Sequence, residues 1–268
     1  PTAVPTGCAY QRLTLEMEKI RILNIDVLDT TRDELLASLR DGVLVTPNID
    51  HLVKLQTDRD FYDVYRAAEW VVCDSRVLQL CSRLTDRPFR EAIPGSSFFT
   101  SYYEYHRDDP DCRIFLLGAA EGVAQEAMRR INARMKRNIV VGALSPSYGF
   151  ENNEEENRHI ARSINESGAT VVLVGVGAPK QEKWIMAHRH EMPSVRLWMA
   201  LGATIDFEAG NIKRAPIWMR RLALEWLYRI IQEPKRMARR YLVDDPVFFR
   251  HFLRQLRGKY SDPFAGGL

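Results

Sequence analysis

Seven stretches of the chain are dominated by apolar, largely aliphatic residues, and each predicts a β-strand. They cover residues 21–28, 43–47, 70–74, 113–118, 138–144, 170–177 and 195–202. The stretches at 43–47, 113–118, 170–177 and 195–202 are apolar almost without interruption. Strands that are covered on both faces show this continuous pattern, whereas half-exposed strands alternate.

Segments with helical periodicity lie between these stretches. A helix is expected after Thr30 or Thr31, and residues 121–136 place Val123, Ala127, Ile131 and Met135 on one stripe. Residues 153–166 begin with the acidic first turn that suits a helix N-terminus, and 180–190 form a further candidate. Alternating strands and helices predict an α/β fold with a mainly parallel, Rossmann-like sheet flanked by helices.

The pattern changes after about residue 212, where a helical, basic segment begins. Helices are expected at 215–234, 235–242 and 246–259. The first carries an apolar stripe, and the third has apolar residues on one side and arginines at i, i+4 and i+7; the apolar positions are Trp218, Leu222, Trp226 and Ile230, then Phe248, Phe249, Phe252, Leu253 and Leu256. Such a helix either lies in a membrane interface or packs its apolar side on the body.

Charge supports a division of the chain into three parts. Residues 213–259 hold 13 Lys/Arg and 4 Asp/Glu, a net of +9, while the whole chain carries +3, so the remainder carries −6. We expect an N-terminal tail (1–20), an α/β catalytic domain (21–212) and a helical appendage (213–268) that prefers anionic surfaces.

Composition excludes several other classes of protein. The 268 residues are 46% hydrophobic and 27% charged, and no apolar run approaches the roughly 20 residues of a membrane helix. The N-terminal residues lack a secretory signal pattern, and the four cysteines lack C-x-x-C spacing. We therefore expect a reducing, cytoplasmic compartment, no disulfide framework, and Cys73 and Cys112 as buried thiols.

Ligands of open α/β sheets bind at the carboxyl ends of the strands, so the residues that follow each strand are the candidate site. Five such segments begin at Thr46, Asp74, Gly118, Gly175 and Leu201, and parallel strands would bring them to one edge. The glycine turns at Gly118 and Gly177 could hold a diphosphate through backbone N–H groups, or could serve only as tight turns.

Familiar cofactor motifs are absent from the sequence. Lys180 occupies the third glycine position of the dinucleotide fingerprint G-x-G-x-x-G, and there is no Walker A motif. The histidines are scattered, and Asp109-Pro110-Asp111 precedes a strand instead of following one, which indicates a polar loop. We expect neither a metal site nor a bound cofactor.

Asp74 is the best candidate for a general base, because a partly desolvated carboxylate at a strand end can have a raised pKa. An Asp that caps the next helix is an equally good interpretation. Asn48 could likewise cap the helix after it, and Thr46 could simply pack. Their common position at one edge favours a pocket.

Several groups of residues together resemble one protein family in order and spacing. They are Thr46-Pro47-Asn48-x-Asp50-His51, the strand ending at Asp74, Gly177-Ala178-Pro179-Lys180-Gln181-Glu182, Ala209-Gly210 with Lys213-Arg214-Ala215-Pro216, and Leu224-Glu225-Trp226-Leu227-Tyr228-Arg229 through Glu233-Pro234 to Arg239-Arg240-Tyr241. The family is the WecG/TagA/CpsF glycosyltransferases, and the resemblance covers roughly residues 22–245. Each motif alone is weak, but motifs in the same register are hard to obtain by chance.

The resemblance implies an inverting, metal-independent transferase of bacterial cell-surface polysaccharide synthesis. Its partners would be a UDP-sugar donor, a polyprenyl-diphosphate-linked sugar acceptor and the anionic cytoplasmic face of the plasma membrane, which the appendage would contact. The family's donors include N-acetylmannosamine, its uronic acid, glucose and galactose, so the sugar stays open. Nucleic acid is not expected as a partner, and apolar residues of the appendage could serve a homo-oligomer that opens on the membrane.

The resemblance also assigns roles by position. Asp74 would be the base, Thr46 and Asn48 would orient the sugar or the base, and Gln181 would line the donor pocket. The turns at Gly118 and Gly177 would hold the nucleotide. Arginines of the appendage would stabilise the leaving diphosphate, and the candidates are Arg214 and Arg221.

One segment departs from the family pattern. Ala92 stands where the family has an arginine, and Ser97 where it has an aspartate. Arg90 would reach the same space only if the segment were extended. If the missing arginine normally binds the diphosphate, this departure alters substrate choice or activity. The alternative function is therefore a non-catalytic protein that binds a nucleotide-sugar or lipid diphosphate on the same fold.

Overall fold

The centre of the molecule is a six-stranded sheet whose strands are all parallel. The computed structural model describes residues 17–266 except 213, 214, 217, 220, 221, 223, 233, 235–241, 243 and 244. Across the sheet the strand order is β4-β3-β8-β7-β5-β6. In chain order the strands are β3 (Gly42–Val45), β4 (Trp70–Val71), β5 (Ile114–Gly118), β6 (Val140–Leu144), β7 (Val171–Gly175) and β8 (Leu197–Ala200). The predicted α/β fold with a parallel sheet is confirmed.

The four strands whose sequence is continuously apolar are the four inner strands of the sheet. Every residue of β5, β7 and β8 is buried, and β3 is buried from Val43 onward. An inner strand has neighbours on both edges and helices on both faces, so no polar side chain can reach water from it. The edge strands are the short β4 and the half-exposed β6.

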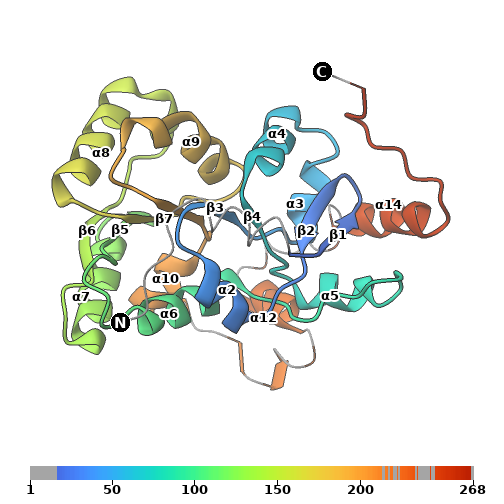
Figure 1. Ribbon diagram of the computed structural model, residues 1–268, viewed down its shortest axis with the longest axis horizontal. Helices are drawn as coiled ribbons and strands as arrows, with labels where there is room; N and C mark the ends of the chain where they lie inside the picture. The colour runs from blue at the N-terminus through green and yellow to red at the C-terminus, as the bar shows by residue number, and fades with distance from the viewer. Residues whose placement is uncertain are drawn as a thin grey trace.

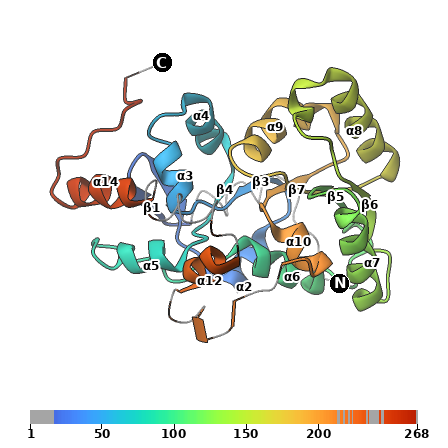
Figure 2. The same ribbon diagram turned by 180° about the vertical axis from the view of Figure 1, so that it is seen from behind.

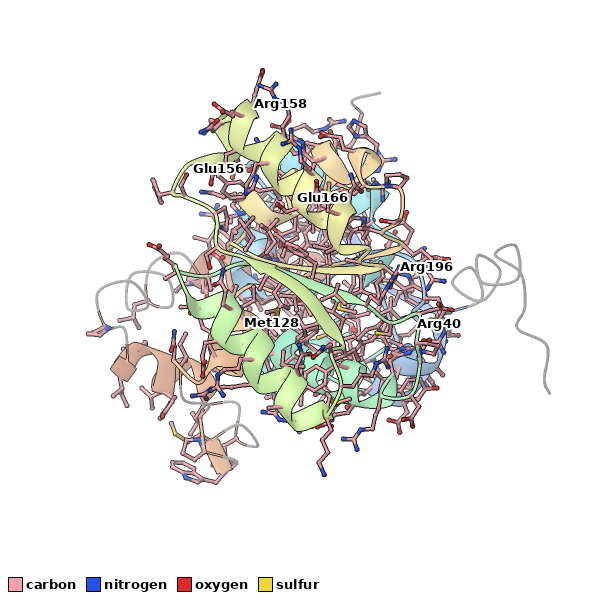
Figure 3. The ribbon with its side chains drawn as sticks, turned by 90° about the vertical axis from the view of Figure 1, so that its left-hand side faces the viewer. Arg40, Met128, Glu156, Arg158, Glu166 and Arg196 are labelled. Atoms are coloured by element: carbon pink, nitrogen blue, oxygen red, sulfur yellow. The ribbon has the colours of Figure 1, made fainter. Side chains whose placement is uncertain are left out.

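Helices form a layer on each face of the sheet (Figures 1 and 2). One face carries α3 (Ile49–Lys54), α4 (Arg59–Ala67), α8 (Glu154–Ser167) and α9 (Lys180–His188). The other carries α2 (Arg32–Ser38), α6 (Gly95–Tyr105), α7 (Val123–Met135) and α10 (Thr204–Ala209). Viewed from the β6 edge, Met128 on α7 and Glu166 on α8 lie on opposite sides of the sheet (Figure 3).

Helix starts follow the expected signals. Thr31 caps α2 in a capping box with Glu34, and Asn153 caps α8 before three glutamates. In α7 the predicted stripe is confirmed at Ala127, Ile131 and Met135, while at its start Ala124 is buried and Val123 only partly so. The buried thiols of Cys73 and Cys112 are confirmed.

The prediction of one strand at 21–28 was wrong. Residues 19–28 form a separate antiparallel hairpin of β1 (Lys19–Ile22) and β2 (Ile25–Leu28), which turns at Leu23 and Asn24. The buried Asn24 donates to the Leu55 carbonyl oxygen at 2.7 Å and accepts from Gln56 Nε2 at 2.9 Å. These tertiary hydrogen bonds hold a turn that lacks glycine and proline.

In the described part of the C-terminal region, the first of the three predicted helices is not continuous. Leu224 is not helical, and α12 (Glu225–Gln232) begins after it, so the single helix expected at 215–234 is interrupted. Most of 235–242 lies outside the described residues. None of the helices in the described part of the chain has the length and apolar character needed to cross a bilayer.

The last helix, α14 (Pro246–Leu256), packs against α3, so its apolar residues are divided between two environments. Phe248 and Phe252 are buried in the core, whereas Phe249, Leu253 and Leu256 stay exposed. The five residues lie on one side of the helix, as expected, but the core covers only part of that side. Gln255 also bonds to the hairpin: its Oε1 accepts from the Leu23 amide at 2.8 Å, and its Nε2 donates to the Arg21 carbonyl at 2.9 Å.

Candidate active site

The five segments that follow the strands lie at one edge of the sheet, as the sequence predicts. Since all six strands are parallel, their carboxyl ends meet there, in the order Asp74 (after β4), Thr46 (β3), Gly202 (β8), Gly175 (β7) and Gly118 (β5). We call this row the carboxyl edge. It brings Thr46, Asn48 and Asp74 to one end and the glycine turns to the middle and the other end.

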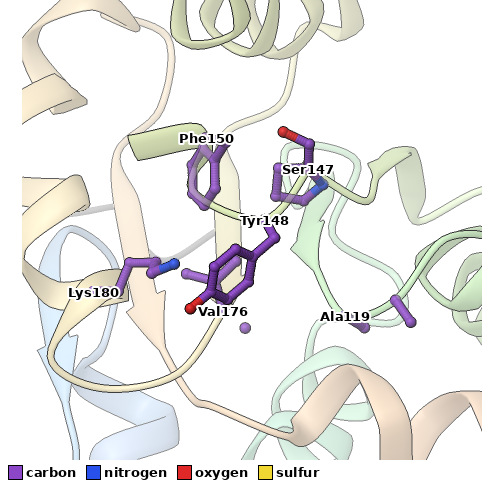
Figure 4. Close-up of a pocket in the computed structure, with 9 residues that line it drawn as sticks. Ala119, Ser147, Tyr148, Phe150, Val176 and Lys180 are labelled. Atoms are coloured by element: carbon purple, nitrogen blue, oxygen red, sulfur yellow. The ribbon is translucent and has the colours of Figure 1, made fainter. Parts of the chain in front are cut away.

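The glycine end holds a pocket of about 320 Å³ (Figure 4). The pocket lies where the chain leaves β5 for α7 on one face and β7 for α9 on the other. Such a divergence opens a crevice at a strand end, and ligands of α/β sheets bind there. The lining residues come from the segments that follow β5, β6 and β7: Ala119, Ala120, Pro146, Ser147, Tyr148, Phe150, Gly175, Val176 and Lys180.

Glycines let the three central strand ends approach closely. A Cβ on Gly118, whose φ is +140°, would lie 2.4 Å from the Gly175 carbonyl oxygen, and a Cβ on Gly175 would lie 2.5 Å from the Gly202 carbonyl oxygen. No side chain fits between backbones at such distances. Gly118 and Gly177 do not line the pocket themselves; their neighbours Ala119 and Val176 do.

Lys180 and Tyr148 face each other across this pocket. The Lys180 ammonium lies 5.0 Å from the centre of the exposed Tyr148 ring and pairs with Glu151 at 2.8 Å. Sequence analysis gave neither residue a role. Lys180 was noted only for breaking a glycine pattern, although a lysine at the start of a helix after a glycine turn is itself a signal for a phosphate.

Asp74 stands half-buried at the other end of the carboxyl edge. Its backbone amide donates to the Pro47 carbonyl at 3.3 Å, and its Oδ1 accepts from the Gly95 amide at 2.8 Å. Gly95 is the first residue of α6, so Asp74 holds the start of a helix that is distant in sequence. The helix directly after it, α5 (Arg76–Ser82), is capped by Ser75 and not by Asp74.

The segment after β3 leads into a buried polar cluster. Asn48 caps α3 by accepting from the His51 amide at 3.2 Å, and Thr46 is buried. The His51 ring Nδ1 lies 2.7 Å from the Tyr65 hydroxyl oxygen. Burial raises the pKa of Tyr65 well above its usual value, and the nearby carboxyls of Glu182, Asp74 and Asp50 add to that shift.

Gln181 links two turns of the carboxyl edge. It is buried, and its Oε1 accepts from the amides of Gly177 at 3.2 Å and Gly202 at 3.1 Å. Its Nε2 donates to Glu182 Oε1 at 2.8 Å. Glu182 is completely buried, and this burial raises the pKa of its carboxyl to about 7. Sequence analysis gave Glu182 no role, because a helical Glu after a turn reads as a surface residue.

In segment 90–97, which differs from the family pattern, Arg90 does not reach the carboxyl edge. Arg90 pairs with Asp29 at 3.1 Å and Glu34 at 2.7 Å, beside the hairpin and α2. Ala92 is half-buried next to Ile93, whose amide donates to the Cys73 carbonyl, and Ser97 lies in the first turn of α6. Arg214 and Arg221 lie outside the described residues.

Within the described ranges, no group of three or more His, Cys, Asp or Glu side chains is arranged to hold a metal ion. Among the described residues that line the pocket, Lys180 is the cation; the nearby amides of Ala119 and Gly177 already donate to the Gly175 carbonyl oxygen and to Gln181 Oε1. The Asp109–Asp111 string lies in the loop before β5, at the opposite end of that strand from the pocket.

The parallel sheet thus has the Asp74 carboxylate at one end of its carboxyl edge and a pocket that contains Lys180 at the other, and ligands of α/β sheets bind at this edge. The chain matches the Glycosyl transferase WecG/TagA/CpsF family over residues 20–262, so it belongs to this family. It is a glycosyltransferase of cell-surface polymer synthesis.

Two relatives make the similarity more specific. The first, an N-acetylglucosaminyldiphosphoundecaprenol N-acetyl-beta-D-mannosaminyltransferase of Bacillus subtilis (strain 168), is 32% identical over 81% of each chain. A protein of the same name from Staphylococcus aureus (strain MW2) is 27% identical over 86% of this chain and 90% of its own. Both carry enzyme names, which favours a catalyst over the non-catalytic alternative.

Proposed function

We propose that this glycosyltransferase moves a sugar from a UDP-sugar to a polyprenyl-diphosphate-linked sugar, with inversion at the anomeric carbon. The observation that carries the proposal is the division of the carboxyl edge. The Asp74 carboxylate stands at one end, while a pocket whose lining includes Tyr148, Phe150 and Lys180 lies at the other. A donor bound between them would present its anomeric carbon toward Asp74 and its diphosphate toward the pocket.

Asp74 is the general base in this proposal. The acceptor hydroxyl is a weak nucleophile, so its proton must leave as the oxygen attacks the anomeric carbon. One carboxylate is enough for a direct displacement from the face opposite UDP, which inverts the configuration. The hydrogen bond from the Gly95 amide orients this carboxylate, and the neighbouring Thr46 and Asn48 would orient the sugar.

The leaving UDP carries the charge that develops in the transition state. Groups already pointing at that position stabilise it most, because they need no reorganisation. In this proposal the Lys180 ammonium supplies that stabilisation from the pocket, without a metal ion. Arg214 and Arg221 would add to it from the appendage.

The names of the relatives suggest the first substrates to test. Both act, by name, on N-acetylglucosaminyldiphosphoundecaprenol as N-acetyl-beta-D-mannosaminyltransferases. UDP-N-acetylmannosamine is therefore the first donor to try, with a polyprenyl-diphosphate N-acetylglucosamine as acceptor. The replacements at Ala92 and Ser97 make a panel of other UDP-sugars necessary.

The acceptor's lipid places the enzyme at a membrane, and we propose the cytoplasmic face of the bacterial plasma membrane with the appendage (213–268) as the contact. Exposed Phe249 and Leu253 stand beside the exposed Arg250 and Arg254 on α14. Apolar and cationic side chains together favour an anionic interface. Since α14 packs on α3, which follows β3, the acceptor would arrive at the Asp74 end.

The experiment that tests the proposal is a UDP-release assay on wild type and Asp74→Asn, with EDTA present. The assay would use a panel of UDP-sugars and a short-chain polyprenyl-diphosphate sugar. We expect UDP release that needs the acceptor, survives EDTA and is lost in the variant. A product whose anomeric configuration is opposite to that of the donor, determined from the one-bond C1–H1 coupling, would establish inversion. Release that needs a divalent ion would contradict the metal-independent mechanism.

A further inference from the structure

Glu182 is a buried acid at the start of α9 that the proposed mechanism does not use. Its side chain is 0% exposed, and Oε1 accepts from Gln181 Nε2. The second oxygen, Oε2, is buried and has no hydrogen-bond partner. An ionised oxygen in this position would lose its hydration without gaining a hydrogen bond, so burial strongly favours the neutral acid.

The charged groups around Glu182 do not reverse this preference. Lys54 on α3 favours the ionised form, but its ammonium already pairs with Asp50 at 2.8 Å, and Asp50 favours the neutral form. The carboxyls of Glu182, Asp74 and Asp50 all raise the pKa of Tyr65 on α4. Lys183, the next residue of α9, pairs with Asp58 at 2.7 Å. Burial dominates, and it raises the pKa of Glu182 to about 7.

Glu182 acts on the carboxyl edge through Gln181. A side-chain amide can be placed with its oxygen and nitrogen exchanged, and its neighbours decide which way it points. Glu182 Oε1 accepts from the Gln181 nitrogen, so the Gln181 oxygen faces the amides of Gly177 and Gly202. The two backbone N–H donors already favour this orientation, and Glu182 supplies the acceptor that the Gln181 nitrogen would otherwise lack.

We propose that Glu182 is a positioning residue that works as a neutral acid and locks the Gln181 amide across the turns after β7 and β8. The inference rests on the proposed function for its effect on transfer, but not for the protonation itself. The neutral acid keeps negative charge at this end of the carboxyl edge on Asp50 and Asp74. When Glu182 ionises, a buried negative charge appears near Asp50 and Asp74, which destabilises the fold and changes the charge at this end of the carboxyl edge.

The sign of the pH dependence follows from proton binding. The folded chain keeps this proton up to about pH 7, whereas an unfolded glutamate releases it near its ordinary pKa of 4.5. The native state thus binds more protons between these pH values, and its stability falls as the pH rises through them. Replacing Glu182 with a side chain that does not titrate would remove this contribution to the pH dependence of stability.

Three variants test the inference. Glu182→Gln keeps the shape and an acceptor for Gln181 but cannot ionise, and Glu182→Ala removes the acceptor. Glu166→Gln makes the same chemical change as the first variant at an exposed position of α8 and serves as the control. Each is compared with wild type by melting temperature from pH 5 to pH 9 and by kcat and donor KM over the same range.

We expect the melting temperature of Glu182→Gln, relative to that of wild type, to increase as the pH rises from 5 to 8. The difference in melting temperature between Glu166→Gln and wild type should not change with pH. A Glu182→Gln curve parallel to wild type would overturn the protonation. The melting-temperature measurement does not require enzyme activity. It therefore tests the protonation of Glu182 even if no donor supports transfer and the proposed function fails.

For activity, we expect wild-type kcat to fall above about pH 7, and Glu182→Gln to stay within about twofold of the wild-type maximum and to lack that fall. Glu182→Ala should raise the donor KM about tenfold at pH 6.5. A Glu182→Gln variant that is inactive at every pH would mean that the carboxylate is required, against the proposal. Wild-type kinetics in a folded Glu182→Ala would remove the positioning role. If Glu182→Ala does not fold, the comparison of Glu182→Gln with wild type still tests whether the neutral acid is the active form.

Discussion

The two ends of the carboxyl edge are built from different chemical groups. At the β3–β4 end, carboxyl side chains dominate: Asp74 and Asp50 lie near the buried Tyr65, with Glu182 beside them. At the β5–β7 end, backbone dominates, because glycines bring the strand ends together and Lys180 is the cation that lines the pocket.

This difference separates the two tasks of glycosyl transfer. A diphosphate is repelled by carboxylates and attracted by N–H groups at helix starts and by an ammonium, so it belongs at the backbone end. A base must be a side chain that can take a proton, so it belongs at the carboxylate end. In the proposed mechanism, the edge would therefore orient the donor by charge before any contact specific to the sugar is made.

The largest effect should come from Asp74→Asn. It keeps the shape and an acceptor for the Gly95 amide but cannot take a proton, so we expect kcat to fall roughly 10²- to 10⁴-fold. Donor affinity, measured by calorimetry, should stay within about twofold, because the diphosphate binds at the other end. Asp41→Asn makes the same change before β3, at the amino edge, and should leave both quantities unchanged. Full activity in Asp74→Asn would remove it as the base.

A methyl group placed between the strand ends should come next. In Gly175→Ala the new Cβ would lie 2.5 Å from the Gly202 carbonyl oxygen, and such overpacking costs about 1–3 kcal/mol. We expect a lower denaturation midpoint together with weaker UDP binding, since the pocket loop must shift. Gly122→Ala has open space but a φ of +79°, so it isolates the cost of backbone strain. Unchanged UDP binding in a destabilised Gly175→Ala would separate the glycines from the donor.

The acceptor side can be tested without the chemistry. Phe249→Ser with Leu253→Ser removes exposed apolar surface from α14 and spares the buried Phe248 and Phe252. Binding to anionic vesicles should weaken about tenfold or more, and the acceptor KM should rise while the donor KM stays. Leu84→Ser, on an exposed leucine after α5, is the control. Deleting residues from 213 onward would be a poorer test, since it strips Phe248 and Phe252 from the core.

The smallest effect should come from Lys180→Ala, the counterpart of the α14 variants. Its ammonium is partly exposed and shared with Glu151, so we expect a donor KM about three- to tenfold higher, more at low salt, with the acceptor KM unchanged. Lys183→Ala changes the same residue type on the same helix, at a position paired with Asp58. An equal rise of the donor KM in both variants would indicate a general loss of positive charge.

Much of the fold could be predicted because burial leaves a direct trace in the sequence. The strands that read as continuously apolar proved to be the inner strands, since only they lack any route to water. The hairpin could not be predicted, because its turn at Leu23–Asn24 depends on hydrogen bonds to residues about thirty positions away. The same holds for α14, whose apolar side is divided by where α3 lies.

The sequence alone determined that Thr46, Asp74 and the glycine turns would share one edge, because parallel strands place every strand end on the same side. Only the tertiary structure decided how the side chains at that edge are connected. Asp74 is oriented by Gly95, and Gln181 bridges Gly177 and Gly202. The raised pKa of Glu182 also depends on tertiary structure, because packing removes water from a carboxyl and brings other charges near it.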